Sequence, residues 1–315
     1  MSNSVVELFA GVGGFHLAAK QSGWNVIWAN QWEPGVKVQH AFDCYKKNFP
    51  DTIAVNDDIA NVIRDIPKHD LLVGGFPCQD YSVAKGNKAE GIRGKKGVLW
   101  WEIHRILSSK KSDYVLLENV DRLLKSPTSQ RGRDFAVMLA SLDELGYVVE
   151  WRSFAASDYG FPQRRTRVYI LAHGPGTPGH TALTGSVSSL EWLSSEGVMA
   201  RAFPIKSTKE YFGFPQFNLR KSDGDDLADV SEAFNTNRGN KSSPFGNAGV
   251  MVGGVVWTTK VESEYSGPLE TLGDILVTPG KVDDSFIIPP IDVLREKGWR
   301  YLKGGKSEAR KGTGG

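Results

Sequence analysis

Short apolar runs alternate with amphipathic segments through the first 173 residues of the chain. Runs rich in β-branched residues predict strands at 4–9, 25–30, 52–56, 70–75, 113–119 and 167–173. Apolar residues at helical spacing predict helices at 16–23, 36–49, 99–111 and 134–146. Near-continuous apolar strands separated by such helices indicate an α/β fold with a mostly parallel, doubly wound sheet. In such a sheet, ligands bind beyond the carboxyl ends of the strands.

The pattern changes after about residue 175. Residues 174–189 are rich in Gly, Ser, Thr and Pro, which predicts a linker or a long loop. Short β-like runs, such as 249–261, follow without regular helices between them. We therefore expect a catalytic domain over 1–178 and a smaller, irregular, β-rich region over 179–315.

Composition narrows the class of protein. The chain has 38 Lys and Arg against 36 Asp and Glu, which excludes a strongly basic coat but not a local basic cleft. Two cysteines, Cys44 and Cys78, imply no disulfide framework and fit a reducing compartment. No signal peptide and no apolar run of membrane-spanning length is apparent, so we expect a cytoplasmic protein that does not enter the membrane.

A Gly-rich turn follows the first strand in "ELFAGVGGF", residues 7–15. Gly11, Gly13 and Gly14 permit a tight turn and close approach of a ligand. Glu33 and Asp58 follow the second and third strands, where such folds bind ribose and the base. Taken alone, the Gly-rich turn could be a plain strand-to-helix turn, and each acid could be an ordinary surface residue. Together, the three features favour binding of a nucleoside-bearing cofactor.

The fourth strand ends in "GGFPCQDYS", residues 74–82, which contains Cys78. A lone cysteine is usually an inert buried thiol. This one lies at the ligand edge and precedes a loop with several cations, which lower the pKa of a thiol and favour the thiolate. Glu118 ends the neighbouring strand, so the pair suggests a nucleophile and an acid.

Four motifs, "ELFAGVGGF", "GFPCQDYS", "LLENV" and "FPQRRTRVYIL", resemble in order and spacing those of the DNA cytosine-5 methyltransferases over residues 5–173. The resemblance implies a Rossmann-like domain that uses S-adenosylmethionine, yields S-adenosylhomocysteine and needs no metal. It implies methyl transfer to C5 of cytosine in duplex DNA through a covalent bond from the cysteine to C6, with base flipping. Residues 179–315 would then be the target-recognition region, and the host would be a bacterium with a restriction–modification system.

The resemblance also assigns roles residue by residue. The implied catalytic residues are Cys78, Glu118, Arg165 and Arg167. The implied cofactor-binding residues are Phe9, Gly11, Gly13, Gly14, Glu33, Pro34, Asp58, Ile59, Pro77 and Leu99. The implied substrate-binding residues are Gln79, Ser82, Lys85, Arg93, Asn119 and Val120.

Two features depart from the family pattern. Pro34 stands where the family often has an aromatic residue that stacks on adenine. The family's closing motifs are not found, since "FGNAGV" at 245–250 mimics one of them only superficially. The chain is therefore expected to be the larger subunit of a split enzyme, completed by a smaller partner, or else a truncated or degenerate copy. A regulatory DNA-binding relative and a tRNA cytosine-5 methyltransferase remain open alternatives.

Overall fold

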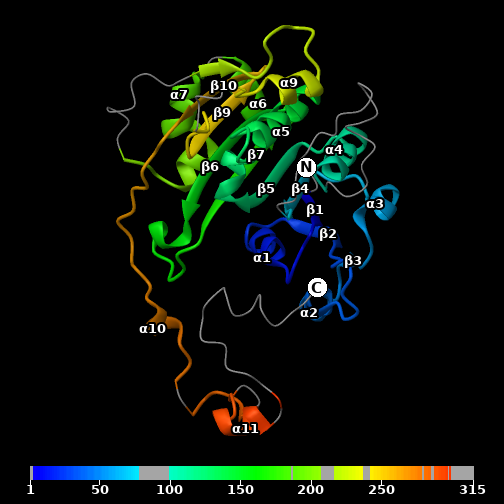
Figure 1. Cartoon of the computed structure of the whole chain (residues 1–315), viewed down its shortest axis with the longest axis vertical. Coiled ribbons are helices and arrows are strands. Elements are labelled where there is room, and N and C mark those ends of the chain that lie inside the picture. The colour runs from blue at the N-terminus through cyan, green and yellow to red at the C-terminus, as the bar shows by residue number, and fades with distance from the viewer. Residues whose placement is uncertain are drawn as a thin grey trace. The chain divides into compact units, whose positions relative to one another are not determined.

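The computed structural model describes residues 3–77, 99–185, 187–206, 216–236, 242–278, 280–284, 287–296 and 298. The chain divides into two compact units, Met1–Leu269 and Glu270–Gly315. The first unit contains a ten-stranded sheet in the order β3-β2-β1-β4-β5-β7-β6-β9-β10-β8 (Figure 1). Within the described residues, no helix is both long enough and apolar enough to span a membrane.

The first half of the sheet is parallel, as the sequence predicts. Its strands are β1 (Ser4–Leu8), β2 (Asn25–Asn30), β3 (Ile53–Val55), β4 (Leu71–Gly75) and β5 (Tyr114–Val120). Residues of β1 and most of β4 are buried on both faces, which explains their unbroken apolar character. The carboxyl ends of these strands form one edge of the sheet.

The second half of the sheet is antiparallel, so the sheet as a whole is mixed. It contains β6 (Val148–Ala155), β7 (Thr166–His173), β8 (Gln216–Asn218), β9 (Ala248–Val252) and β10 (Val255–Thr259). β9 and β10 form a hairpin in the predicted β-like run, and its turn uses Gly253 and Gly254 at φ 55° and 73°. The α/β fold is confirmed, while the parallel arrangement ends at β5.

Strand β6 was not among the predicted strands, because two charged residues interrupt its apolar pattern. Glu150 and Arg152 are both only 2% exposed. Glu150 contacts His173 at 3.1 Å, and the Arg152 guanidinium donates to the main-chain carbonyls of Leu193, Met199 and Phe203. Charged groups that are hydrogen-bonded inside the protein can occupy a central strand, which simple hydrophobic patterning does not anticipate.

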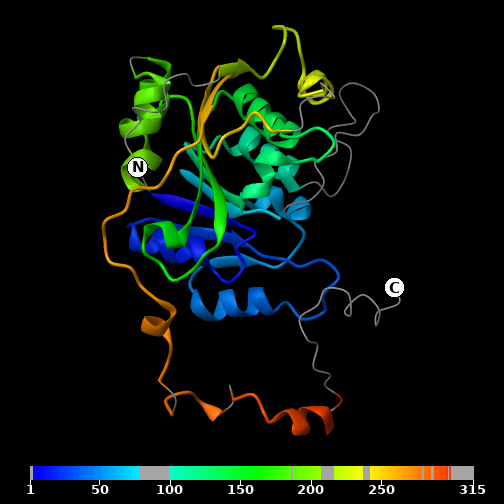
Figure 2. The same cartoon turned by 60° about the vertical axis from the view of Figure 1, so that its left-hand side comes forward.

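Helices cover both faces of the sheet (Figure 2). One face carries α3 (Ile59–Val62), α4 (Leu99–Lys110), α5 (Arg133–Glu144) and α9 (Leu227–Ala233). The other face carries α1 (Gly14–Gln21), α2 (His40–Asn48), α6 (Pro178–Thr184), α7 (Ser189–Glu191), the π-helix η4 (Trp192–Glu196) and α8 (Val198–Ala202). Short 3₁₀ segments are η1 (Ile63–Asp65), η2 (Asp121–Lys125) and η3 (Ala156–Tyr159).

The expected linker at 174–189 is wrong in part, because α6 forms within it. Thr177 caps this helix by accepting a hydrogen bond from the His180 N–H at 3.3 Å, and Pro178 occupies its first turn. The proline and threonine that suggested a loop are thus helix-start residues. The sheet also continues beyond residue 178, and the division of function at that residue stays a prediction.

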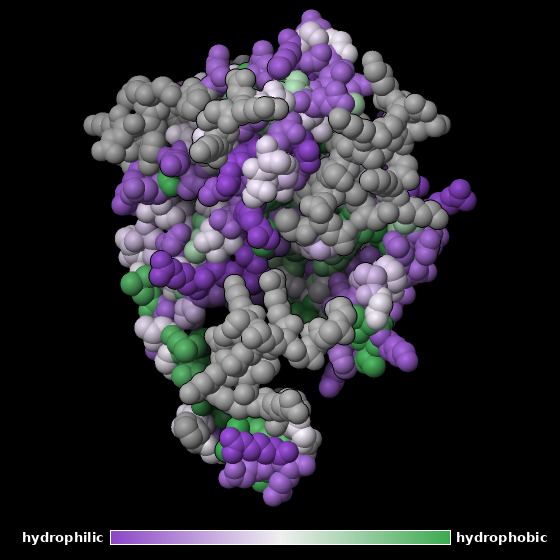
Figure 3. Space-filling view, in the orientation of Figure 1, coloured by the Kyte–Doolittle hydropathy of each residue, from purple (hydrophilic) through white to green (hydrophobic). Residues whose placement is uncertain are grey.

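The described residues of the second unit form two short helices, α10 (Leu272–Ile275) and α11 (Ile291–Glu296). Several of its large apolar side chains are exposed, with Leu276 at 65% and Ile288 at 78%. Hydrophobic and hydrophilic residues lie side by side on its surface (Figure 3).

Candidate active site

The carboxyl edge of the parallel strands gathers the predicted catalytic side chains that the structure describes. Register pairs Gly75 of β4 with Glu118 of β5. A Cβ on Gly75 would lie 3.2 Å from Glu118 Oε2, so glycine gives the carboxylate room at this edge. Pro77, two residues after the end of β4, is exposed. Cys78, Gln79, Ser82, Lys85 and Arg93 lie outside the described residues, and their roles stay predictions.

Glu118 forms an ion pair with Arg167 of β7, with 2.5 Å between Oε1 and Nε. Burial raises the pKa of Glu118, and the positive charge of Arg165 opposes that rise. The contact with Arg167 acts in the same direction as Arg165. The site therefore holds a partly buried carboxyl group between two cations, which suits a group that must exchange a proton with a bound base.

Asn119 connects the ends of two strands. It is 2% exposed, and its Nδ2 donates to the Phe76 carbonyl at 3.0 Å. Its Oδ1 accepts from the Val120 N–H at 2.8 Å. The Asn119 amide thus fixes the main chain directly before the Pro77-Cys78 pair, which is an ordering role and not a chemical one.

The Gly-rich turn has the conformation that its residues predict. Gly11 and Gly13 have φ of 56° and 95°, and Phe9 also has a positive φ of 53°. A Cβ on Gly13 would overlap the ring of Phe49, so no larger residue fits there. Gly14 begins α1. The turn therefore brings main-chain atoms to the surface at the start of a helix, where an anionic or polar group can bind.

A buried polar group lies beneath this turn. Glu7 of β1 is fully buried, and it accepts a hydrogen bond from the Tyr45 hydroxyl at 3.1 Å. Tyr45 also contacts His16 Nδ1 at 2.8 Å, and the His16 ring stacks on Phe49. Burial raises the pKa of Glu7 to about 7 and lowers the pKa of His16. Sequence patterning did not single out this cluster, because Glu7 lies within an apolar strand.

The predicted ribose and adenine residues lie on the loops after β2 and β3. Glu33 is half-buried, and within the described part of the chain its carboxylate has no hydrogen bond or ion pair. Pro34 is exposed. Asp58 accepts from the Ala60 N–H at 3.0 Å and caps α3, and Ile59 is buried. Leu99 is half-buried at the start of α4. Asp58 thus has a structural task beside any binding role.

Two residues at this edge were missed by sequence reasoning. Gln31 follows the last residue of β2, and its Oε1 accepts a hydrogen bond from the Gly11 N–H at 2.8 Å. Trp32 is 37% exposed and directly precedes Glu33. An aromatic residue was expected only after the acid. The signal that points to Gln31 and Trp32 is their position immediately beyond the strand.

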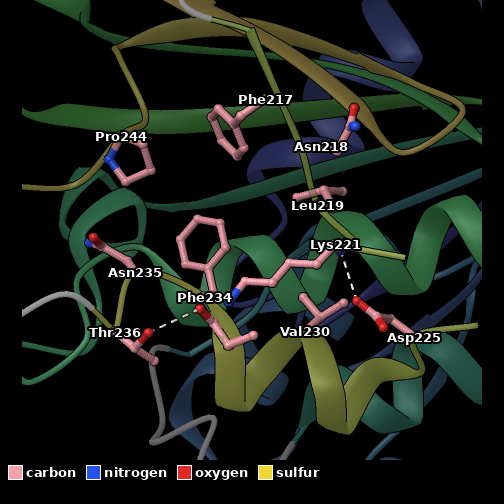
Figure 4. A pocket seen from close by; sticks show the side chains of 11 residues that line it. Phe217, Asn218, Leu219, Lys221, Asp225, Val230, Phe234, Asn235, Thr236 and Pro244 are labelled. Atoms are coloured by element: carbon pink, nitrogen blue, oxygen red, sulfur yellow. Dashed lines mark hydrogen bonds between the residues drawn. The ribbon is translucent and has the colours of Figure 1, made fainter. Parts of the chain in front are cut away.

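A separate cavity of about 330 Å³ lies between β8 and α9 (Figure 4). Phe217, Leu219, Val230 and Phe234 supply its apolar wall. Its polar residues are Asn218 at the end of β8 and, from the adjoining loops, Lys221, Asp225, Asn235 and Thr236. In the described part of the chain, no group of three or more metal-ligating side chains is found.

A family model for C-5 cytosine-specific DNA methylases matches residues 3–242. The chain belongs to this family. It is therefore a DNA cytosine-5 methyltransferase, of a family that uses S-adenosylmethionine and acts on DNA. The predicted family is confirmed.

Several relatives are named type II methyltransferases. Type II methyltransferase M.Sau3AI of Staphylococcus aureus is 45% identical over 313 residues, which cover 97% of this methylase and 72% of the relative. M.NgoBI of Neisseria gonorrhoeae is 34% identical over 55% of this methylase and 51% of its own chain. M.SsoII of Shigella sonnei is 38% identical over 53% of this methylase and 41% of its own chain. The methylase thus spans about half the length or less of the last two.

The comparisons give no support to the expected second subunit. M.Sau3AI matches nearly the whole of this methylase within one polypeptide. Its match covers 97% of this methylase, so it extends through the region after residue 178.

Proposed function

We propose that this methylase transfers the methyl group of S-adenosylmethionine to C5 of cytosine within a specific duplex sequence, through a transient bond from Cys78 to C6. The observation that supports this most is the arrangement at the carboxyl edge. There Glu118 and Arg167 form an ion pair, and Asn119 fixes the end of the neighbouring strand directly before the Pro77-Cys78 pair.

The chemistry follows from the electronic character of the base. C5 of cytosine is a weak nucleophile, and addition of the Cys78 thiolate to C6 moves an electron pair of the ring toward C5. Glu118 protonates or hydrogen-bonds N3 as the thiolate adds, while Arg165 and Arg167 bind the polar edge of the base. C5 then takes the methyl group. Loss of the C5 proton restores the double bond and expels the Cys78 thiolate, so atoms and electrons balance.

The residues of the Gly-rich turn and the adjoining loops fit the cofactor. Bound S-adenosylmethionine supplies an electrophilic methyl group. Phe9, Gly11, Gly13 and Gly14 would bind its amino-acid end. The carboxylate of Glu33, which has no ion pair among the described residues, would bind its ribose. The remainder of the cofactor site would be lined by Asp58, Ile59, Pro34, Pro77 and Leu99. To these predicted residues we add Trp32, whose exposed ring can stack on adenine in place of the aromatic residue that Pro34 replaces.

The DNA must open for this reaction. A cytosine inside a duplex cannot reach a thiol at the sheet edge, so the base has to flip out of the helix. Gln79, Ser82, Lys85, Arg93 and Val120 are proposed to bind the flipped nucleotide and its phosphates. In a bacterial cytoplasm, methylation of a short site would protect host DNA from a matching endonuclease.

Transfer of tritiated methyl groups to duplex DNA and to tRNA tests the proposal. We expect label on duplex DNA, and none for Cys78→Ser. Cys44→Ser is the matched control, since Cys44 is an exposed cysteine away from the sheet edge and its loss should leave transfer intact. Label on tRNA alone would overturn the DNA assignment, and full turnover by Cys78→Ser would overturn the covalent mechanism.

A further inference from the structure

The charge of the first unit is unevenly distributed, although the whole chain is nearly neutral. One region, residues 221–232, carries five carboxylates, Asp223, Asp225, Asp226, Asp229 and Glu232, against the single cation Lys221. It includes α9 and borders the cavity of Figure 4. A phosphate backbone would be repelled there. DNA that reaches the carboxyl edge must therefore approach over a different part of the surface.

The 3₁₀ segment η2 begins directly after β5, whose end carries Glu118. Arg122 and Lys125 are exposed on this segment. Side chains three residues apart are eclipsed in a 3₁₀ helix, so both project from the same face, about 6 Å apart along its axis. That interval spans neighbouring phosphates of one DNA strand.

Neither cation is neutralised within the described residues. The nearby carboxylates of Glu118 and Asp134 pair with Arg167 and Arg133. Asp121 is the one exposed carboxylate on η2 itself. Arg164 and Arg165 add two exposed cations before β7, beside which η2 packs. The edge near the catalytic carboxyl thus presents an excess of positive charge.

The segment is also rigidly anchored. Leu123 and Leu124, which separate the two cations, are 0% and 4% exposed. The Ser243 hydroxyl donates to the Leu124 carbonyl at 2.5 Å, and the Ser126 N–H donates to the Leu123 carbonyl at 3.2 Å. Because the main chain of η2 is fixed, little conformational entropy is lost when it binds a ligand. The two cations are also held in a defined position beside the site.

We propose that η2 is a phosphate-binding element in which Arg122 and Lys125 contact the sugar–phosphate backbone of duplex DNA beside the methylated base. The inference rests on the proposed function, because it takes DNA as the substrate. These two residues position the duplex and do not take part in the chemistry.

Salt dependence of duplex binding tests this element. Each phosphate contact contributes about 0.9 to the slope of log affinity against log salt. Arg122→Ala/Lys125→Ala should lower that slope by about 2, measured by fluorescence anisotropy with a labelled random-sequence duplex. Arg64→Ala/Lys68→Ala is the matched control, because it removes one exposed arginine on η1 and one exposed lysine between η1 and β4. Its slope should equal that of the wild type.

The outcomes separate this inference from the proposed reaction. The proposal for η2 would be wrong if the folded Arg122→Ala/Lys125→Ala variant kept the wild-type slope. It would also be wrong if both double variants lost the same amount of slope. Arg122→Glu/Lys125→Glu should weaken binding further, and circular dichroism verifies that each variant folds. If neither the wild type nor any variant transfers methyl groups but the slopes differ as expected, the proposed reaction is wrong and the phosphate-binding role of η2 is retained. If the wild type transfers methyl groups and the slopes do not differ, the proposed reaction is retained and the phosphate-binding role of η2 is wrong.

Discussion

Glu7→Gln tests the buried carboxyl beneath the Gly-rich turn. The Glu7 side chain is fully buried on β1, and its Oε2 accepts a hydrogen bond from the Tyr45 hydroxyl. Burial raises its pKa from 4.5 to about 7. Folding therefore requires this carboxyl to stay protonated at pH values where the unfolded chain would release the proton.

The sign and size of the effect follow from linkage. Because the folded pKa is the higher one, the stabilisation from Glu7 is complete below about pH 4.5 and is lost as the pH rises to about 7. A pKa difference of this size between the folded and unfolded states corresponds to about 3 kcal/mol in the free energy of unfolding. Gln stays uncharged, so the stability of Glu7→Gln relative to the wild type should rise by about 3 kcal/mol between pH 4.5 and 7.5.

Urea unfolding followed by tryptophan fluorescence, at several pH values across this range, measures the difference. The relevant quantity is the change with pH, since any fixed cost of an unpaired amide is the same at each pH. Glu232→Gln, an exposed carboxylate on α9, controls for the loss of a charge. A Glu7→Gln difference that stays constant with pH would refute the reasoning.

Three further changes probe other parts of the molecule. Gly13→Ala should lower the free energy of unfolding by roughly 2 kcal/mol, measured by thermal unfolding, because the φ of Gly13 is 95° and a Cβ would overlap Phe49. Gly14→Ala should lower it far less, and equal losses would contradict the turn geometry. Arg152→Met should cost about 3 kcal/mol in urea unfolding, since it leaves buried main-chain carbonyls unpaired, and a loss under about 1 kcal/mol would count against that role. Glu118→Gln should lower kcat for methyl transfer by roughly 100-fold or more with cofactor binding retained, and an unchanged kcat would remove Glu118 from the chemistry.

Much of the parallel half of the sheet follows from local sequence. β1, β4 and β5 are apolar runs, and their ends coincide with glycines or polar residues that the ligand edge requires. Glu118 and the Gly-rich turn were therefore located correctly at the edge of the sheet. Periodicity also found α4 and α5, whose buried stripes face the sheet.

The remainder depends on contacts between residues far apart in sequence. β6 holds Glu150 and Arg152, which only the later segments 173–203 can pair. The role of Gln31 depends on a hydrogen bond to Gly11, and no local pattern reveals it. The antiparallel half likewise depends on which strand pairs with β5, and composition alone does not decide that.

Covalent trapping tests the central claim most directly. The full chain is incubated with S-adenosylmethionine and a random-sequence duplex in which 5-fluorocytosine replaces cytosine. Fluorine cannot leave C5 as a proton does, so the bond from the thiol to C6 should persist after methyl transfer. The account predicts a denaturation-resistant adduct that peptide mapping assigns to Cys78, and that is absent in Cys78→Ser. An adduct through Cys44, or none from a protein that binds both cofactor and duplex, would contradict it.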